Sequence, residues 1–167
     1  MMLKEFSVNE LCFNPFEKIG QEWCLISAGN EESYNTMTAS WGGVGVLWNK
    51  SVATVYIRPQ RYTKKFIDGS DTFTLAFFPE GYKNALTFCG RYSGRDYDKA
   101  KETGLTPWFS DGTVAFEEAN LVLVCRKLYA QEMSEDCFVD KYVLERNYPN
   151  NDLHTVYVGE IVKAYRK

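Results

Sequence analysis

Three short stretches combine hydroxyl groups, cations and glycines in a spacing that suits the binding of a phosphate and a flat polar group. They read TASWGG at 38–43, RPQRYT at 58–63 and GRYSGRDYDK at 90–99. In the first, Trp41 is followed by three glycines within four residues. Glycine in a strand often marks a bend or a site where something approaches the backbone closely. We therefore expect the strand to break here beside a planar polar ligand.

The other two stretches are basic. Arg58 and Arg61 flank a short turn, and Thr63 stands at an expected helix start. Guanidinium groups and the free N–H groups of a helix N-terminus together can hold a phosphate. The third stretch carries Ser93, Arg95 and Lys99 around Gly90 and Gly94. Taken singly, either stretch is also typical of a solvated surface, and Arg61 of a surface ion pair.

Several common catalytic arrangements are missing from the sequence. It contains neither G-x-G-x-x-G nor G-x-x-x-x-G-K-[ST], which argues against a dinucleotide cradle and a P-loop. His154 is the only histidine, and no G-x-S-x-G elbow is present. The five cysteines form no C-x-x-C pair, so a redox dithiol, a zinc site and a disulfide framework are all disfavoured. We expect neither a hydrolase nor a metal site.

Composition narrows the class of protein further. A chain of 167 residues and 19.2 kDa suits one domain over residues 1–167. The net charge of −3 provides no basic field for nucleic acid. The N-terminus lacks the apolar core of a signal peptide and no stretch is long enough to cross a membrane, so we expect a cytoplasmic enzyme or carrier. The aromatic content of 16% suits an aromatic core, a subunit interface or a pocket for a planar ligand.

Alternating and glycine-bounded patterns predict more strands than helices. Strands are expected at 23–28, 34–41, 51–59, 71–78, 119–133 and 154–165, the last with a bulge near Gly159, and helices at 60–70, 82–90 and 137–146. Thr63 is a candidate N-cap and Gly90 a candidate C-cap. The polar stretch 91–104 contributes nothing to the expected core. Strands joined by hairpins or one short helix favour an antiparallel barrel with peripheral helices, a mainly β fold.

Together, the motifs NTMTASWGG, VYIRPQRYT and FCGRYSGRDYDK resemble the flavin reductase-like, FMN-binding split-barrel family, most closely its flavoredoxin branch. HTVYVGEIV also resembles the closing strand of that family. The resemblance runs from about Trp23 to the end of the chain. It implies an antiparallel Greek-key split β-barrel that binds FMN and pairs as a homodimer.

The resemblance also implies which residues bind the cofactor. Thr38, Ala39 and Ser40 would lie along the edge of the isoalloxazine ring, with Trp41 as a wall. The phosphate turn would supply Arg58, Gln60, Arg61, Tyr62 and Thr63, while Ser93 and Lys99 would close over the phosphate. Cys89 would approach the flavin, although its spacing from Ala85 is also typical of a core residue.

His154 is the one candidate for a catalytic side chain. Members of the wider family often carry a histidine in the pair DH before the final strand, on the nicotinamide side of the flavin. Here Leu153 separates Asp152 from His154. A structural role for this histidine therefore stays open beside a catalytic one.

Two activities follow from the resemblance. The first is NAD(P)H-dependent reduction of flavin, and the second is electron transfer by a flavoredoxin-like carrier that a protein partner reduces. A third alternative is an interaction barrel without flavin. Because flavin itself carries out hydride and electron chemistry, a protein that binds it needs no side-chain nucleophile.

Overall fold

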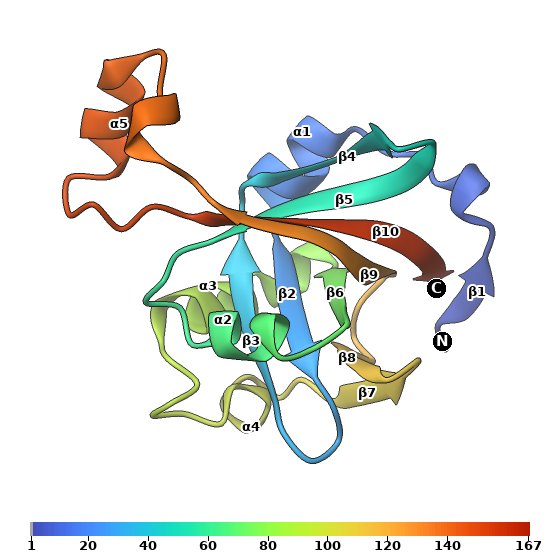
Figure 1. Cartoon of the computed structure of the whole chain (residues 1–167). Helices are drawn as coiled ribbons and strands as arrows, with labels where there is room; N and C mark the ends of the chain where they lie inside the picture. The colour runs from blue at the N-terminus through green and yellow to red at the C-terminus, as the bar shows by residue number, and fades with distance from the viewer. Residues whose placement is uncertain (1) are drawn as a thin grey trace.

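Antiparallel pairing joins most strands of the computed structural model, which describes residues 2–167, into one curled sheet (Figure 1). In spatial order the strands are β3 (Tyr34–Ala39), β2 (Cys24–Gly29), β6 (Thr72–Phe77), β9 (Leu121–Glu132), β10 (Thr155–Arg166), β5 (Lys50–Ile57) and β4 (Gly42–Leu47), and β1 (Lys4–Phe6) pairs with the end of β10. The mainly β, antiparallel fold predicted from the sequence is confirmed.

The strands β3 and β4 lie at opposite ends of this order although they follow one another in the chain. Only Ser40 and Trp41 join them. The chain therefore crosses from one edge of the sheet to the other at these two residues. The barrel is split at this point, since β3 and β4 are not paired with each other in the described part of the chain.

Side-chain alternation places apolar groups on both faces of the sheet. Ile26, Phe73 and Leu123 belong to the core inside the barrel, whereas Leu25 and Val122 belong to a second cluster on the outer face. All five are buried. Neighbouring residues of one strand point to opposite faces, so β2 and β9 each contribute to two cores.

The bulge expected at Gly159 is confirmed. Pairing of β10 with β9 shifts in register between Val158 and Gly159. A Cβ atom at Gly159 would lie 2.6 Å from Cζ of Phe73. Glycine is required there because the ring of Phe73 occupies the space that a side chain would fill.

Helices and a separate hairpin surround the barrel. They are α1 (Pro15–Glu17), α2 (Thr63–Asp68), α3 (Lys83–Arg91), α4 (Lys99–Thr103) and α5 (Lys141–Asn147), the short helices η1 (Val8–Glu10), η2 (Lys18–Glu22), η3 (Glu80–Tyr82) and η4 (Glu135–Cys137), and the hairpin β7 (Pro107–Ser110) with β8 (Thr113–Phe116). Figure 1 shows α5 projecting from the barrel, carried on the ends of β9 and β10. None of the helices in residues 2–167 is long and apolar enough to cross a membrane.

The strand breaks after Ala39, as expected, although the break falls at Ser40 and Trp41 and the glycines that follow belong to strand β4, paired with β5. Three local expectations are corrected. Tyr62 precedes α2 and Thr63 is its first residue, so Thr63 is not the N-cap. Gly90 lies inside α3, where it allows the helix to pack on Thr38. The polar stretch 91–104 contributes Ala100 of α4 to the outer core. The strands β1, β7 and β8 were not predicted.

Candidate functional site

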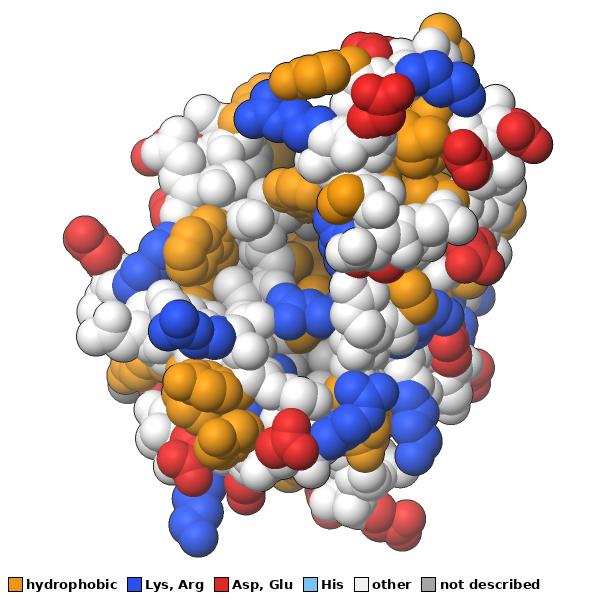
Figure 2. Space-filling view, turned by 90° about the vertical axis from the view of Figure 1, so that its left-hand side faces the viewer, with side chains coloured by type: hydrophobic (Ala, Val, Ile, Leu, Met, Phe, Trp, Pro, Cys, Tyr) orange, Lys and Arg blue, Asp and Glu red, His pale blue; other side chains and the backbone are white. Residues whose placement is uncertain are grey.

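A cleft of about 330 Å³ opens where β3 passes into β4. Figure 2 shows the face from which α5 projects, with a hollow that has Lys and Arg side chains in and around it. The cleft is lined by the end of β3, by the end of β5 and the turn after it, and by His154. Of the residues predicted from the sequence, it brings together Thr38, Ala39, Ser40, Trp41, Arg58, Gln60, Arg61 and His154.

Two further cavities adjoin this cleft through Ser40. One, of about 590 Å³, shares Ser40, Trp41 and Tyr56 with the cleft and has no charged residue in its lining. The other, of about 380 Å³, lies on the α3 side and shares Thr38 and Ser40. The site thus has a cationic centre with largely apolar flanks, an arrangement typical of pockets for small molecules and cofactors.

Arg61 connects the turn after β5 to β3 and α3. Its Nη1 donates to the carbonyl of Gly90 at 2.7 Å, and its Nη2 to the carbonyl of Thr38 at 3.4 Å. Burial, followed by the positive charge of Arg58, lowers the pKa of Arg61. The two guanidinium groups are therefore close enough to repel each other.

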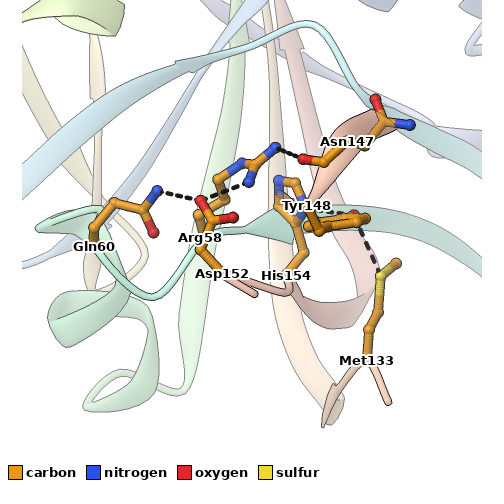
Figure 3. A network of polar contacts seen from close by, with 7 residues as sticks. All are labelled: Arg58, Gln60, Met133, Asn147, Tyr148, Asp152 and His154. Carbon is orange, nitrogen blue, oxygen red and sulfur yellow. Dashed lines mark hydrogen bonds and ion pairs between the residues drawn. The ribbon is translucent and has the colours of Figure 1, made fainter. Parts of the chain in front are cut away.

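Arg58 lies at the end of β5 and is held by the end of α5 and the segment that follows it (Figure 3). Its Nη1 lies 2.6 Å from Oδ2 of Asp152, and its Nη2 donates to the carbonyl of Asn147 at 2.8 Å. Gln60 donates to the same Asp152 oxygen at 2.8 Å. Hydrogen bonds from Gln60 and Arg58 lower the pKa of Asp152, so this carboxylate is charged at neutral pH.

His154 is enclosed by aromatic rings at the edge of the cleft. Its ring centre lies 5.4 Å from that of Trp41 and 6.5 Å from that of Tyr56. Its Nδ1 lies 2.7 Å from the hydroxyl of Tyr148. Burial, and then the positive charge of Arg58, lower the pKa of His154 to about 4, so its imidazole is neutral at pH 7.

Three residues that were predicted to bind the cofactor instead make hydrogen bonds or core contacts behind the cleft. Thr63 is buried and its hydroxyl accepts from Asn35 Nδ2 at 2.9 Å. The Lys99 ammonium donates to the carbonyls of Thr36 and Cys89, each at 2.7 Å, and burial lowers its pKa to about 8. Cys89 belongs to the outer core, and burial raises its pKa to about 11. The structure does not bring these side chains into the cleft.

Tyr62 and Ser93 also lie outside the lining of the cleft. Arg95 stacks over the Tyr62 ring at 4.7 Å, and the Ser93 hydroxyl accepts from the Arg95 amide at 3.2 Å. The same Arg95 donates to the carbonyl of Gln60 at 3.3 Å. These residues support the turn 58–63 from outside the cleft.

Sequence reasoning missed three residues that shape the site. Tyr56 lies on the same strand face as Arg58, so strand periodicity could have identified it as a site residue. Asp152 and Tyr148 have no such signal, because a segment distant in sequence brings them to β5. No group of three or more His, Cys, Asp or Glu side chains in residues 2–167 is placed to hold a metal ion.

Comparison with known proteins identifies the family. A family model described as the flavin reductase like domain matches residues 16–167. This chain belongs to the flavin reductase-like domain family, as the motifs predicted. No curated protein matches the chain.

Solved structures share its fold. A flavoredoxin from Methanosarcina acetivorans is 21% identical with a TM-score of 0.71, over 98% of this chain and 76% of the other. The flavoredoxin of Desulfovibrio vulgaris (Miyazaki F) is 19% identical with a TM-score of 0.69, over 98% and 77%. The NADH:FAD oxidoreductase of Streptomyces globisporus C-1027, solved with NAD and FAD fragments, is 16% identical with a TM-score of 0.64, over 87% and 74%. The split-barrel fold of FMN-binding flavin reductase-like proteins is confirmed.

Proposed function

We propose that the protein binds FMN in the cleft beside Ser40 and acts as an oxidoreductase of the flavin reductase type, which takes hydride from NAD(P)H. The observation that carries this proposal is the approach of Arg58 and Arg61 at a cleft that adjoins an uncharged cavity with aromatic walls. Membership of the flavin reductase-like family supports it.

The cleft fits the phosphate of FMN on electrostatic grounds. The charge of Arg58 contributes to the lowered pKa of Arg61. Asp152 offsets that charge from one side only, through its ion pair with Arg58. A phosphate between the two guanidinium groups would relieve their repulsion, and Gln60 lies beside them as a further hydrogen-bond donor.

The flavin ring would lie along the end of β3. Because β3 is an end strand, the outer side of its backbone has no strand partner in residues 2–167. Apart from the Thr38 carbonyl, which accepts from Arg61, the backbone groups on this outer side are therefore available to the polar edge of a planar ligand. Trp41 and Tyr56 provide apolar surface beside them. When bound, FMN supplies the hydride and electron chemistry, while these residues orient it and limit access of water.

The uncharged cavity of about 590 Å³ next to the cleft offers space for a nicotinamide ring. Its wall includes Tyr56, Met133 and Tyr148, all on the side of the cleft where His154 lies. A nicotinamide stacked there would reach the flavin without a nucleotide-binding domain of its own.

Exposed apolar side chains around this cavity favour the second candidate, a flavoredoxin-like carrier. Phe16 is 85% exposed and Trp41 is 50% exposed, and both line the cavity. They could contact a protein electron donor or a second copy of the chain in a homodimer. Two of the similar structures are flavoredoxins.

Two measurements test the proposal. The purified protein should retain or take up FMN through gel filtration at one FMN per chain, and its elution volume should correspond to a dimer. Anaerobic mixing with NADH or NADPH in a stopped-flow instrument should then bleach the visible absorbance of the bound flavin. If neither nucleotide bleaches it and a reduced protein donor does, the protein is a carrier. A protein that takes up no FMN would refute both activities.

A further inference from the structure

Tyr148 lies where the projecting α5 arm meets the cleft, and its hydroxyl has one short polar contact. It directly follows α5, and its amide donates to the carbonyl of Leu144 at 2.8 Å. Leu144, Leu153, Met133 and Phe138 pack around its ring. This cluster fixes the ring so that its hydroxyl lies 2.7 Å from Nδ1 of His154 (Figure 3).

The hydroxyl proton has two acceptors to choose from. Nδ1 of His154 lies at 2.7 Å, and the sulfur of Met133 lies at 3.6 Å. An imidazole nitrogen is a much stronger acceptor than a thioether sulfur, and the shorter contact is that of a normal O–H···N hydrogen bond. The hydroxyl of Tyr148 therefore donates to Nδ1.

This choice determines the tautomer of His154. A neutral imidazole carries one proton, so when Nδ1 accepts, Nε2 must carry it. The one hydrogen bond of the ring to another described residue is that of Nδ1 with Tyr148, and the ring lines the cleft. The carbonyl of His154 accepts from the amide of Met133 at 2.9 Å, which also holds the residue in place.

We infer that Tyr148 is a positioning residue that holds His154 as a neutral Nε2–H donor directed at the ligand in the cleft. The neighbouring side chains of Gln60, Arg58 and Arg61 are hydrogen-bond donors as well. The cleft therefore selects a ligand rich in acceptor oxygens and nitrogens. The inference deepens the proposed function and rests on it for the identity of the ligand. The tautomer itself does not depend on FMN.

Because His154 is the only histidine, long-range ¹H–¹⁵N NMR reports its tautomer without assignment of other imidazoles. The unsubstituted protein, free of FMN, should show a protonated Nε2 and an unprotonated Nδ1. The opposite pattern would mean that Tyr148 accepts from Nδ1–H and donates to Met133, and it would overturn the inference. This measurement requires no variant to fold.

Substitutions then test whether Tyr148 positions the ring of His154 or only packs against it. Tyr148→Phe should give a mixture of both tautomers and weaken FMN binding about five-fold, the effect of one ordinary hydrogen bond. The control is Tyr142→Phe on the exposed side of α5, which should change neither. Met133→Leu should also leave the tautomer unchanged. A single unaltered tautomer in Tyr148→Phe would refute the positioning role, and unchanged FMN affinity would refute the donor role. If FMN binds to none of these proteins, the proposed function fails while the tautomer result still stands.

Discussion

Arg58 and Asp152 form an ion pair of 2.6 Å that ties the end of β5 to the segment before β10, directly at the cleft. The contact fixes the guanidinium group from one side. Its Nη2 is held by the carbonyl of Asn147, and the ring of Tyr148 lies 4.9 Å beneath it. The guanidinium group of Arg58 is therefore oriented before any ligand binds. This reduces the conformational entropy that is lost on binding.

We expect Arg58→Gln to weaken binding of FMN by about 10- to 100-fold, because it removes a charge-assisted hydrogen bond to the phosphate. Binding of riboflavin, which lacks the phosphate, should change little. Isothermal titration of both ligands checks this. Arg126→Gln is the matched control, because Arg126 pairs with Glu160 on the surface and does not line the cleft. An equal loss for FMN and riboflavin would place the phosphate elsewhere.

Lys99→Met should lower the free energy of unfolding by about 1–3 kcal/mol, since the carbonyls of Thr36 and Cys89 would each lose a buried donor. The ratio of FMN to riboflavin affinity should not change, because the ammonium faces away from the cleft. Urea denaturation and ligand titration measure the two effects. A fall in the ratio would instead support the contact between Lys99 and the phosphate that the family resemblance implies.

The substitution Gly159→Ala should destabilise the protein by about 1–3 kcal/mol, through overpacking against Phe73. The new Cβ atom would lie 2.6 Å from Cζ of that ring and 2.9 Å from Cβ of Cys125. Gly45→Ala is the control, because nothing lies within 4 Å of its added Cβ atom. The urea midpoints should differ clearly between the two variants. Equal midpoints would show that the bulge in β10 accommodates a side chain.

His154 should make stability depend on pH between its ordinary pKa of 6.5 and its folded value of about 4. In this range the unfolded chain binds a proton that the folded chain does not, so the folded state loses stability as the pH falls. The loss should reach at most about 3 kcal/mol by the bottom of the range. It should be absent above pH 6.5.

Urea denaturation of the natural chain and of His154→Gln at several pH values isolates this contribution. Carboxylates that titrate in the same range affect both proteins and cancel in the difference. Parallel pH profiles for the two proteins would mean that His154 binds protons equally in the folded and unfolded states.

Local pattern was sufficient for much of the barrel. Alternation in β5 and β6, and the parity shift at Gly159, act over a few residues, and the structure reproduces them. The glycine-rich β4 was missed for a physical reason. Glycine weakens an isolated strand, and only its pairing with β5, far around the sheet from β3, makes 42–47 extended.

By itself, the amino-acid sequence determined the family, the antiparallel strands and the stretches from which the cleft is built, because motifs and alternation are properties of neighbouring residues. Only the tertiary structure decided which side chains of those stretches face the cleft. Thr63, Cys89 and Lys99 point into the protein because α2, α3 and α4 pack with these faces inward. Asp152 and Tyr148 reach Arg58 because β9 and β10 carry the α5 arm back to the end of β5. Contacts between segments so distant in the chain depend on packing of the whole barrel, which no local pattern encodes.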